Sequence, residues 1–230
     1  MFAIFKKDLI GIIDNNVAFF AQMIFLIILS LGMWIIWPRV PESITVKSQV
    51  SATFFHLGSF LLFILSSLWA PVFSSSSVIK EYESNCWDML ILCSIKPFEI
   101  LLAKLLASMF YFIFLLSGSL PISGLCFLLG GVELNSIINN YIFILLAMLA
   151  FSQISIICSS YMKNTYTAIS LSYLIIMPII FITSLIFIKF SIEVYIFSVI
   201  YLFANIILFT VSCQRFKNSR IISIESNKKT

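Results

Sequence analysis

Six long apolar runs restrict what this 230-residue chain can fold into. Each run reaches the length of about 20 residues that a helix needs to cross a bilayer. Apart from Glu193, the second residue of the last run, the runs contain no Asp, Glu, Lys or Arg. The predicted spans are residues 17–37, 54–74, 105–130, 141–160, 166–187 and 192–212. We therefore predict an all-α polytopic membrane protein with six transmembrane helices in a single domain, 1–230.

The composition excludes a water-soluble globule of this length. Hydrophobic residues make up 61% of the chain and charged residues only 10%, whereas about 25% of the residues in a soluble domain are charged. Six spans and their short connections leave no room for a folded soluble domain. Any step that consumes ATP must therefore be supplied by another polypeptide.

Lys and Arg are distributed unequally between the two predicted sides of the membrane. The N-terminus, the second and fourth connections and the tail hold 11 of the 14, and the opposite side holds Arg39, Lys47 and Lys189. Because basic residues favour the cytoplasmic side, we predict that both termini are cytoplasmic in a plasma or inner membrane. The net charge of +4 requires no nucleic acid, because the basic tail 213–230 would lie among anionic lipid headgroups.

The sequence carries no motif that favours an enzyme. It has no G-x-x-x-x-G-K-[ST] phosphate loop and no His, Cys and carboxylate residues at metal-ligand spacing. We therefore expect no catalytic residue, cofactor or metal in this chain. The uncharged span interiors also disfavour a proton-coupled carrier, because such carriers use ionisable groups within the membrane.

The N-terminal segment 1–15 is predicted to form an interfacial helix. Phe2, Phe5 and Leu9 recur at helical spacing while Lys6 and Lys7 lie elsewhere, which is typical of a helix lying flat in the cytoplasmic interface. The alternative is a basic flank that only orients the first span.

The connection 80–104 is the longest cytoplasmic connection and carries 7 of the chain's 24 charged residues. Ser84 or Asn85 provides a cap, with Asp88 in the following turn, and this pattern predicts a short helix. Pro97 marks a second break, after which the next helix begins at 99–104. Such a helix beneath the membrane would suit the docking of a cytosolic protein, whereas the alternative is a solvated loop.

The same connection resembles the loop between the second and third spans of ABC transporter permeases of the type 2 family. An acidic pair, a Trp-acid pair, an apolar run, a Pro-aromatic-Glu-Ile sequence and a Lys follow in that family's order. The matching residues are Glu81, Glu83, Trp87, Asp88, Pro97, Glu99 and Lys104. Asn85 stands where the family usually has Gly, and Cys93-Ser94 where it usually has Thr-Pro. Weaker similarity extends over nearly the whole chain.

The resemblance implies a membrane subunit of an exporter, in which those seven residues couple the permease to a separate cytosolic ATPase that binds the ATP. It also implies a dimer with itself or with a sister permease. One alternative from the same superfamily is the haem exporter subunit of cytochrome c maturation, for which the single His56 offers little support. An alternative from another class is a non-transporting six-helix assembly protein.

Polar residues within the predicted spans allow two interpretations. Serines and Gln153 either line a path for a substrate or let helices pack closely and hydrogen-bond to each other, and we favour packing. The residues concerned are Ser66, Ser67, Ser74 to Ser77, Ser152, Gln153, Ser155, Ser159 and Ser160. We also expect Pro71, Pro121 and Pro178 to kink the second, third and fifth spans.

Overall fold

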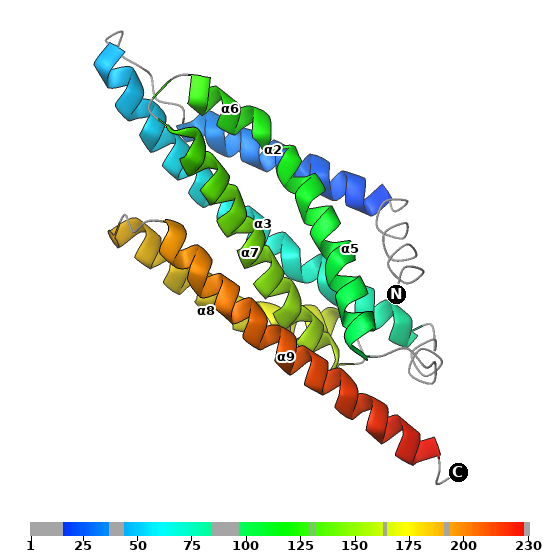
Figure 1. Ribbon diagram of the computed structural model, residues 1–230. Coiled ribbons are helices and arrows are strands. Elements are labelled where there is room, and N and C mark those ends of the chain that lie inside the picture. The colour runs from blue at the N-terminus through cyan, green and yellow to red at the C-terminus, as the bar shows by residue number, and fades with distance from the viewer. Residues whose placement is uncertain are drawn as a thin grey trace.

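The computed structural model describes residues 16–36, 44–83, 97–128, 130, 132–162, 165–190 and 194–227 (Figure 1). These residues are almost entirely helical, and none of those described lies in a strand. The helices are α2 (Asn16–Ile36), α3 (Ile44–Glu83), α5 (Pro97–Ser117), α6 (Leu120–Leu128), α7 (Leu134–Ser159), α8 (Thr165–Phe190) and α9 (Val194–Asn227). The predicted all-α class is therefore confirmed.

Helix α7 lies at the centre of the bundle. It packs along α3 on one side and along α9 on the other, while α8 contacts both α3 and α7 (Figure 1). The contact between α3 and α7 is aromatic: the ring of Phe63 stacks on Phe143 with centroids 5.3 Å apart and also lies near Phe151. All three side chains are buried, so these rings fix how α3 lies against α7.

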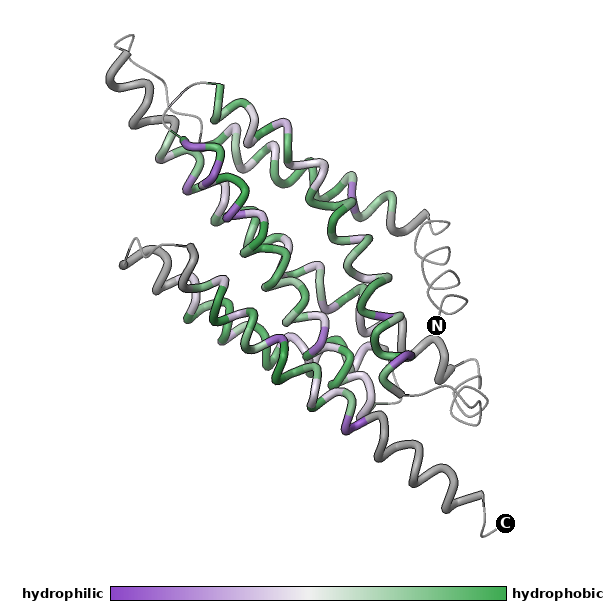
Figure 2. Tube along the Cα trace, in the orientation of Figure 1, coloured by the Kyte–Doolittle hydropathy of each residue, from purple (hydrophilic) through white to green (hydrophobic). Residues whose placement is uncertain are grey.

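Apolar residues cover most of the length of the helices, and the polar residues gather mainly near their ends (Figure 2). Five of the described helices contain apolar stretches long enough to cross a bilayer. These stretches are Ala52–Ser75, Phe98–Ser117, Leu134–Ser159, Tyr166–Ser184 and Phe197–Arg215. Helix α2 contributes a shorter apolar stretch, Phe19–Ile35. A multi-pass membrane protein is thus confirmed, and the count of six spans stays a prediction.

The third span differs from the predicted range 105–130. Helix α5 begins earlier, at Pro97, and ends at Ser117, and α6 follows as a separate short helix. Gly118 lies at the break, where an added Cβ would be 2.8 Å from the Leu26 side chain of α2. Pro121 then occupies the first turn of α6, where its missing N–H costs no helical bond. Pro121 therefore marks a helix start instead of a kink within a span.

Because α5 starts earlier than predicted, the apolar stretches that the structure shows are not free of charged residues. The apolar stretch of α5 includes Glu99 and Lys104, and that of α9 reaches Arg215. Glu99 and Lys104 lie in the first two turns of α5, and Arg215 is the last residue of the apolar stretch of α9, so the charged residues stand at the ends of these stretches.

Two helices extend well beyond the apolar runs that predicted them. Helix α3 spans 40 residues and reaches Glu83, and α9 spans 34 residues, so that the predicted tail is helical as far as Asn227. Pro71 and Pro178 lie inside α3 and α8. The predicted interfacial helix 1–15 and the short coupling helix expected within 84–96 lie outside the described residues.

Candidate functional site

The residues of the predicted coupling connection lie at one end of the bundle. Glu81 and Glu83 belong to the last turn of α3, and Pro97 is the first residue of α5. The end of α3, the start of α5 and the C-terminal end of α9 lie toward the same end of the molecule (Figure 1). Trp87 and Asp88 lie outside the described residues. The structure therefore places the two flanks of the connection but not its centre.

Helix α5 begins at Pro97 for two local reasons. Proline at the first helical position is preorganised for a helix and loses no hydrogen bond there. Glu99 lies in the first turn, where a negative charge is favoured by the helix dipole. Next to Pro97, the half-exposed ring of Phe98 contacts the Phe209 ring of α9 edge to face, with centroids 5.3 Å apart. The start of α5 is thereby fixed against α9.

Lys104 occupies a different environment from the other predicted coupling residues. Its side chain is only 2% exposed. The neighbouring Leu101 and Leu105 pack with Ile156 of α7, and Phe209 and Cys213 of α9 lie against this cluster. The first half of α5 is therefore embedded among other helices, and Lys104 lies within that packing instead of on a surface open to a docking protein.

An aromatic contact fixes α9 at the same end of the molecule. The guanidinium carbon of Arg215 lies 3.9 Å from the centroid of the Tyr161 ring, just after the end of α7. The Nε atom of Arg215 is buried with no hydrogen-bond partner. This cation–π contact joins α9 to the end of α7 where α9 leaves its apolar stretch.

The turn of α3 around Pro71 receives hydrogen bonds from two other helices. The Tyr173 hydroxyl of α8 donates to the Leu68 carbonyl at 2.5 Å, and the Ser155 hydroxyl of α7 donates to the Pro71 carbonyl at 3.0 Å. Ser75 donates to the same Pro71 carbonyl at 2.7 Å from within α3. The carbonyl that loses its helical donor at Pro71 is that of Ser67, four residues earlier, so these bonds attach the turn to α7 and α8 instead of replacing the missing bond.

The remaining described serines of the predicted polar set bond to their own helix. Ser66, Ser67 and Ser74 donate to carbonyls three or four residues earlier in α3. Ser152, Ser159 and Ser160 do the same in α7. All of these except Ser160 are buried, which favours the packing interpretation, although these bonds lie within one helix and not between helices. The side chains of Ser76 and Ser77 lie outside the described residues.

A second polar contact joins α7 to α9 within the apolar region. The Gln153 side-chain amide donates to Oδ1 of Asn205 at 3.2 Å, and Nδ2 of Asn205 donates to the Leu146 carbonyl at 2.9 Å. Asn205 also donates to the Tyr201 carbonyl of its own helix at 2.7 Å. The side-chain oxygen of Gln153, Oε1, is buried without a hydrogen-bond partner. Gln153 belongs to the predicted polar set and Asn205 does not, although an amide within an apolar run is itself a sign of a helix contact.

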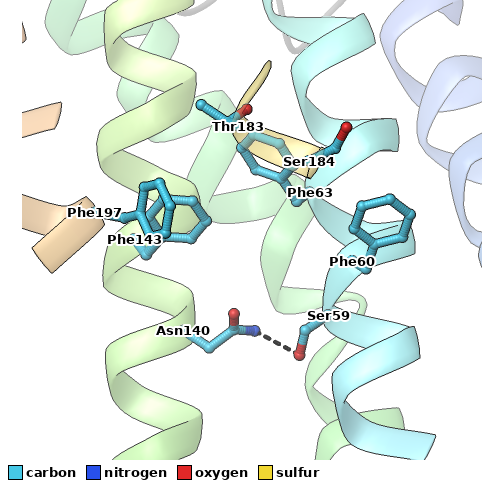
Figure 3. A pocket seen from close by; sticks show the side chains of 8 residues that line it. All are labelled: Ser59, Phe60, Phe63, Asn140, Phe143, Thr183, Ser184 and Phe197. Atoms are coloured by element: carbon cyan, nitrogen blue, oxygen red, sulfur yellow. Dashed lines mark hydrogen bonds between the residues drawn. The ribbon is translucent and has the colours of Figure 1, made fainter. Parts of the chain in front are cut away.

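A small cavity lies between α3, α7, α8 and α9 (Figure 3). At its edge the Asn140 amide donates to the Ser59 hydroxyl at 2.9 Å. The cavity measures about 10 Å³, which is room for one water molecule at most. Its lining is completed by Phe60, Phe63, Phe143, Thr183, Ser184 and Phe197. This cavity is therefore too small for a cargo molecule.

The arrangement described so far is a helical membrane bundle with a charged connection at one end. A family model described as ABC-2 family transporter protein matches residues 37–222, which is most of the chain. The chain belongs to the ABC-2 family. This ABC-2 protein is thus a membrane-embedded permease component of an ABC transporter. Comparisons with curated proteins and with solved structures gave no match.

Proposed function

We propose that this ABC-2 protein is the membrane-spanning subunit of an exporter that is driven by a separate cytosolic ATPase bound at the connection 80–104. The observation that carries the proposal is the family match over 37–222, which includes α3, α5 and the whole connection between them. The convergence of α3 and α5 at one end of the bundle supports it (Figure 1).

The ends of both helices are suited to transmit a push from such a partner. Helix α3 continues without interruption from its apolar stretch to Glu83. Helix α5 is embedded from Ile100 to Ser108 and contacts α9 through Phe98 and Phe209. Closure of an ATPase against the connection would therefore act directly on the ends of both helices.

The remaining features of the proposal follow from the charges and the family. Six spans with both termini on the cytoplasmic side of the plasma or inner membrane place 11 of the 14 Lys and Arg residues in the cytoplasm. ATP would be bound and hydrolysed by the partner, so that this chain needs no catalytic residue, cofactor or metal of its own. A second copy or a sister permease would complete the path for the cargo.

The proposal is tested by purifying the tagged chain in mild detergent. We expect a protein that binds and hydrolyses ATP to accompany it. Replacing Glu83 and Trp87 by Ala should lower the amount of this partner by about tenfold or more, because buried aromatic anchors dominate protein interfaces.

The matched control replaces Glu133 and Leu134 by Ala. These are also an acidic and a large apolar residue, but both are exposed at the other end of the bundle. Recovery of the ATPase should be unchanged in this control. Equal recovery with all three chains would show that the connection is not the coupling element, and the absence of any ATPase would overturn the proposal itself.

A further inference from the structure

The Pro71 turn of α3 combines a missing hydrogen-bond donor with bonds from two other helices. Proline has no N–H, so the Ser67 carbonyl, four residues earlier, has no helical donor at this position. Tyr173 of α8 and Ser155 of α7 donate not to that carbonyl but to the carbonyls of Leu68 and Pro71 in the same turn. Pro71 is buried and Ser155 is fully buried, so the bond from Ser155 belongs to the packed interior, and the bond from Tyr173 is partly buried.

We infer that the Pro71 turn is a hinge of α3, and that Tyr173 and Ser155 are positioning residues that hold it in the arrangement seen here. The inference rests on the proposed function, because it assigns to the hinge the transmission of movement from the connection 80–104. The part of α3 beyond the hinge would move with the ATPase, and the part before it would stay packed against α7.

The hinge lies far enough from the end of α3 for a small bend to produce a displacement of several ångströms. Glu83 lies 12 residues beyond Pro71, which corresponds to about 18 Å of helix at about 1.5 Å per residue. A change of about 20° at a proline, a bend typical of proline kinks, would move the end of α3 by about 6 Å. A small change at the Pro71 turn is thus sufficient to displace the start of the connection.

Hydrogen bonds suit this role better than apolar contacts. The bonds from Tyr173 and Ser155 measure 2.5 and 3.0 Å, and such bonds weaken steeply when the donor and acceptor separate or turn. Apolar side chains tolerate sliding over similar distances. The two bonds therefore favour one arrangement of the turn over others and break together when α3 bends.

The experiment measures the distance between nitroxide labels at residues 82 and 162 in the full complex with its ATPase in lipid nanodiscs. The labels are introduced as unnatural amino acids, which leaves the five cysteines in place. In the unmodified chain we expect two distance populations whose ratio changes when ATP and vanadate trap the ATPase. Tyr173→Phe and Ser155→Ala should each shift the nucleotide-free ratio toward the trapped population by about threefold, and the double variant by about ninefold.

Two further variants distinguish the loss of a bond that holds the hinge from a general weakening of helix packing. Ser152→Ala removes a hydroxyl of equal burial that bonds only to the Leu149 carbonyl of its own helix, and it should leave the ratio unchanged. Pro71→Ala restores a donor to the Ser67 carbonyl, stiffens α3 and should reduce the response to ATP and vanadate, which is the opposite effect.

A double variant with the same ratio as Ser152→Ala would overturn the inference. So would a single distance population in the unmodified chain with and without nucleotide. If no ATPase assembles with the chain, the proposed function fails instead. The nucleotide-free ratios can then still be measured on the chain alone in nanodiscs, so the two failures are distinguishable.

Discussion

Replacement of Asn205 tests the polar contact between α7 and α9. Asn205→Leu preserves the branched shape of the side chain but removes its amide. Two interhelical bonds are lost, one to the Leu146 carbonyl and one from the Gln153 amide. Gln153 is buried, and its Oε1 already has no partner. The substitution therefore leaves the whole Gln153 amide without a partner in the helix contact.

The expected cost follows from these bonds. Interhelical side-chain bonds in membranes contribute about 0.6 kcal/mol each, so two lost bonds amount to about 1.2 kcal/mol. An unpartnered buried amide adds about 1 kcal/mol. We therefore expect Asn205→Leu to lower the free energy of unfolding by about 2 kcal/mol. Gln153→Met removes one bond together with the unpartnered oxygen, and should cost about 0.5 kcal/mol or less.

The double variant distinguishes this reasoning from simple loss of contacts. With Gln153→Met and Asn205→Leu together, an apolar pair replaces the amide pair, and no buried amide is left. We expect a total cost of about 1 kcal/mol, which is smaller than the cost of Asn205→Leu alone. Unfolding of the four chains would be followed by steric trapping in bicelles. Additive costs, with the double variant the least stable, would refute the reasoning.

Further predictions concern packing and the cation–π contact. Gly32→Val should weaken the packing of α2 on α3, because a Cβ at Gly32 would lie 2.7 Å from Leu61 Cδ1; cross-linking between cysteines placed on the two helices should fall. Gly124→Val is the control, since its Cβ would meet no atom within 4 Å. Arg215→Gln should cost about 0.5–1 kcal/mol of unfolding free energy in bicelles by removing the cation over the Tyr161 ring. In a chain that already carries Tyr161→Leu the same substitution should cost nothing, and an equal cost in both backgrounds would contradict the contact.

The apolar runs predicted the class of fold and the core of each long helix. The run 141–160 lies within α7 except for its last residue, and 166–187 lies within α8. Boundaries were less predictable, because hydropathy reports where a helix is apolar and not where its backbone hydrogen bonds end. Helix α3 therefore continues through Lys80 to Glu83, beyond its apolar run. The break at Gly118 was missed since an apolar run on both sides concealed it.

The contacts between helices had no local signal in the sequence. Tyr173 and Leu68 are 105 residues apart, and Asn140 and Ser59 are 81 apart. Their pairing depends on how α3, α7 and α8 lie together, which the periodicity of one helix does not specify. The coupling residues were identified through a resemblance in local order, so the burial of Lys104 could be learned only from the packing of α5.

The central claim is that the connection between α3 and α5 contacts an ATP-hydrolysing partner. It is tested most directly by a photo-cross-linking amino acid at position 87, compared with the same amino acid at the exposed position 134 at the other end of the bundle. The account predicts a covalent adduct with an ATP-binding protein from position 87 and none from position 134. The absence of such an adduct at position 87, or equal adducts at both positions, would contradict it.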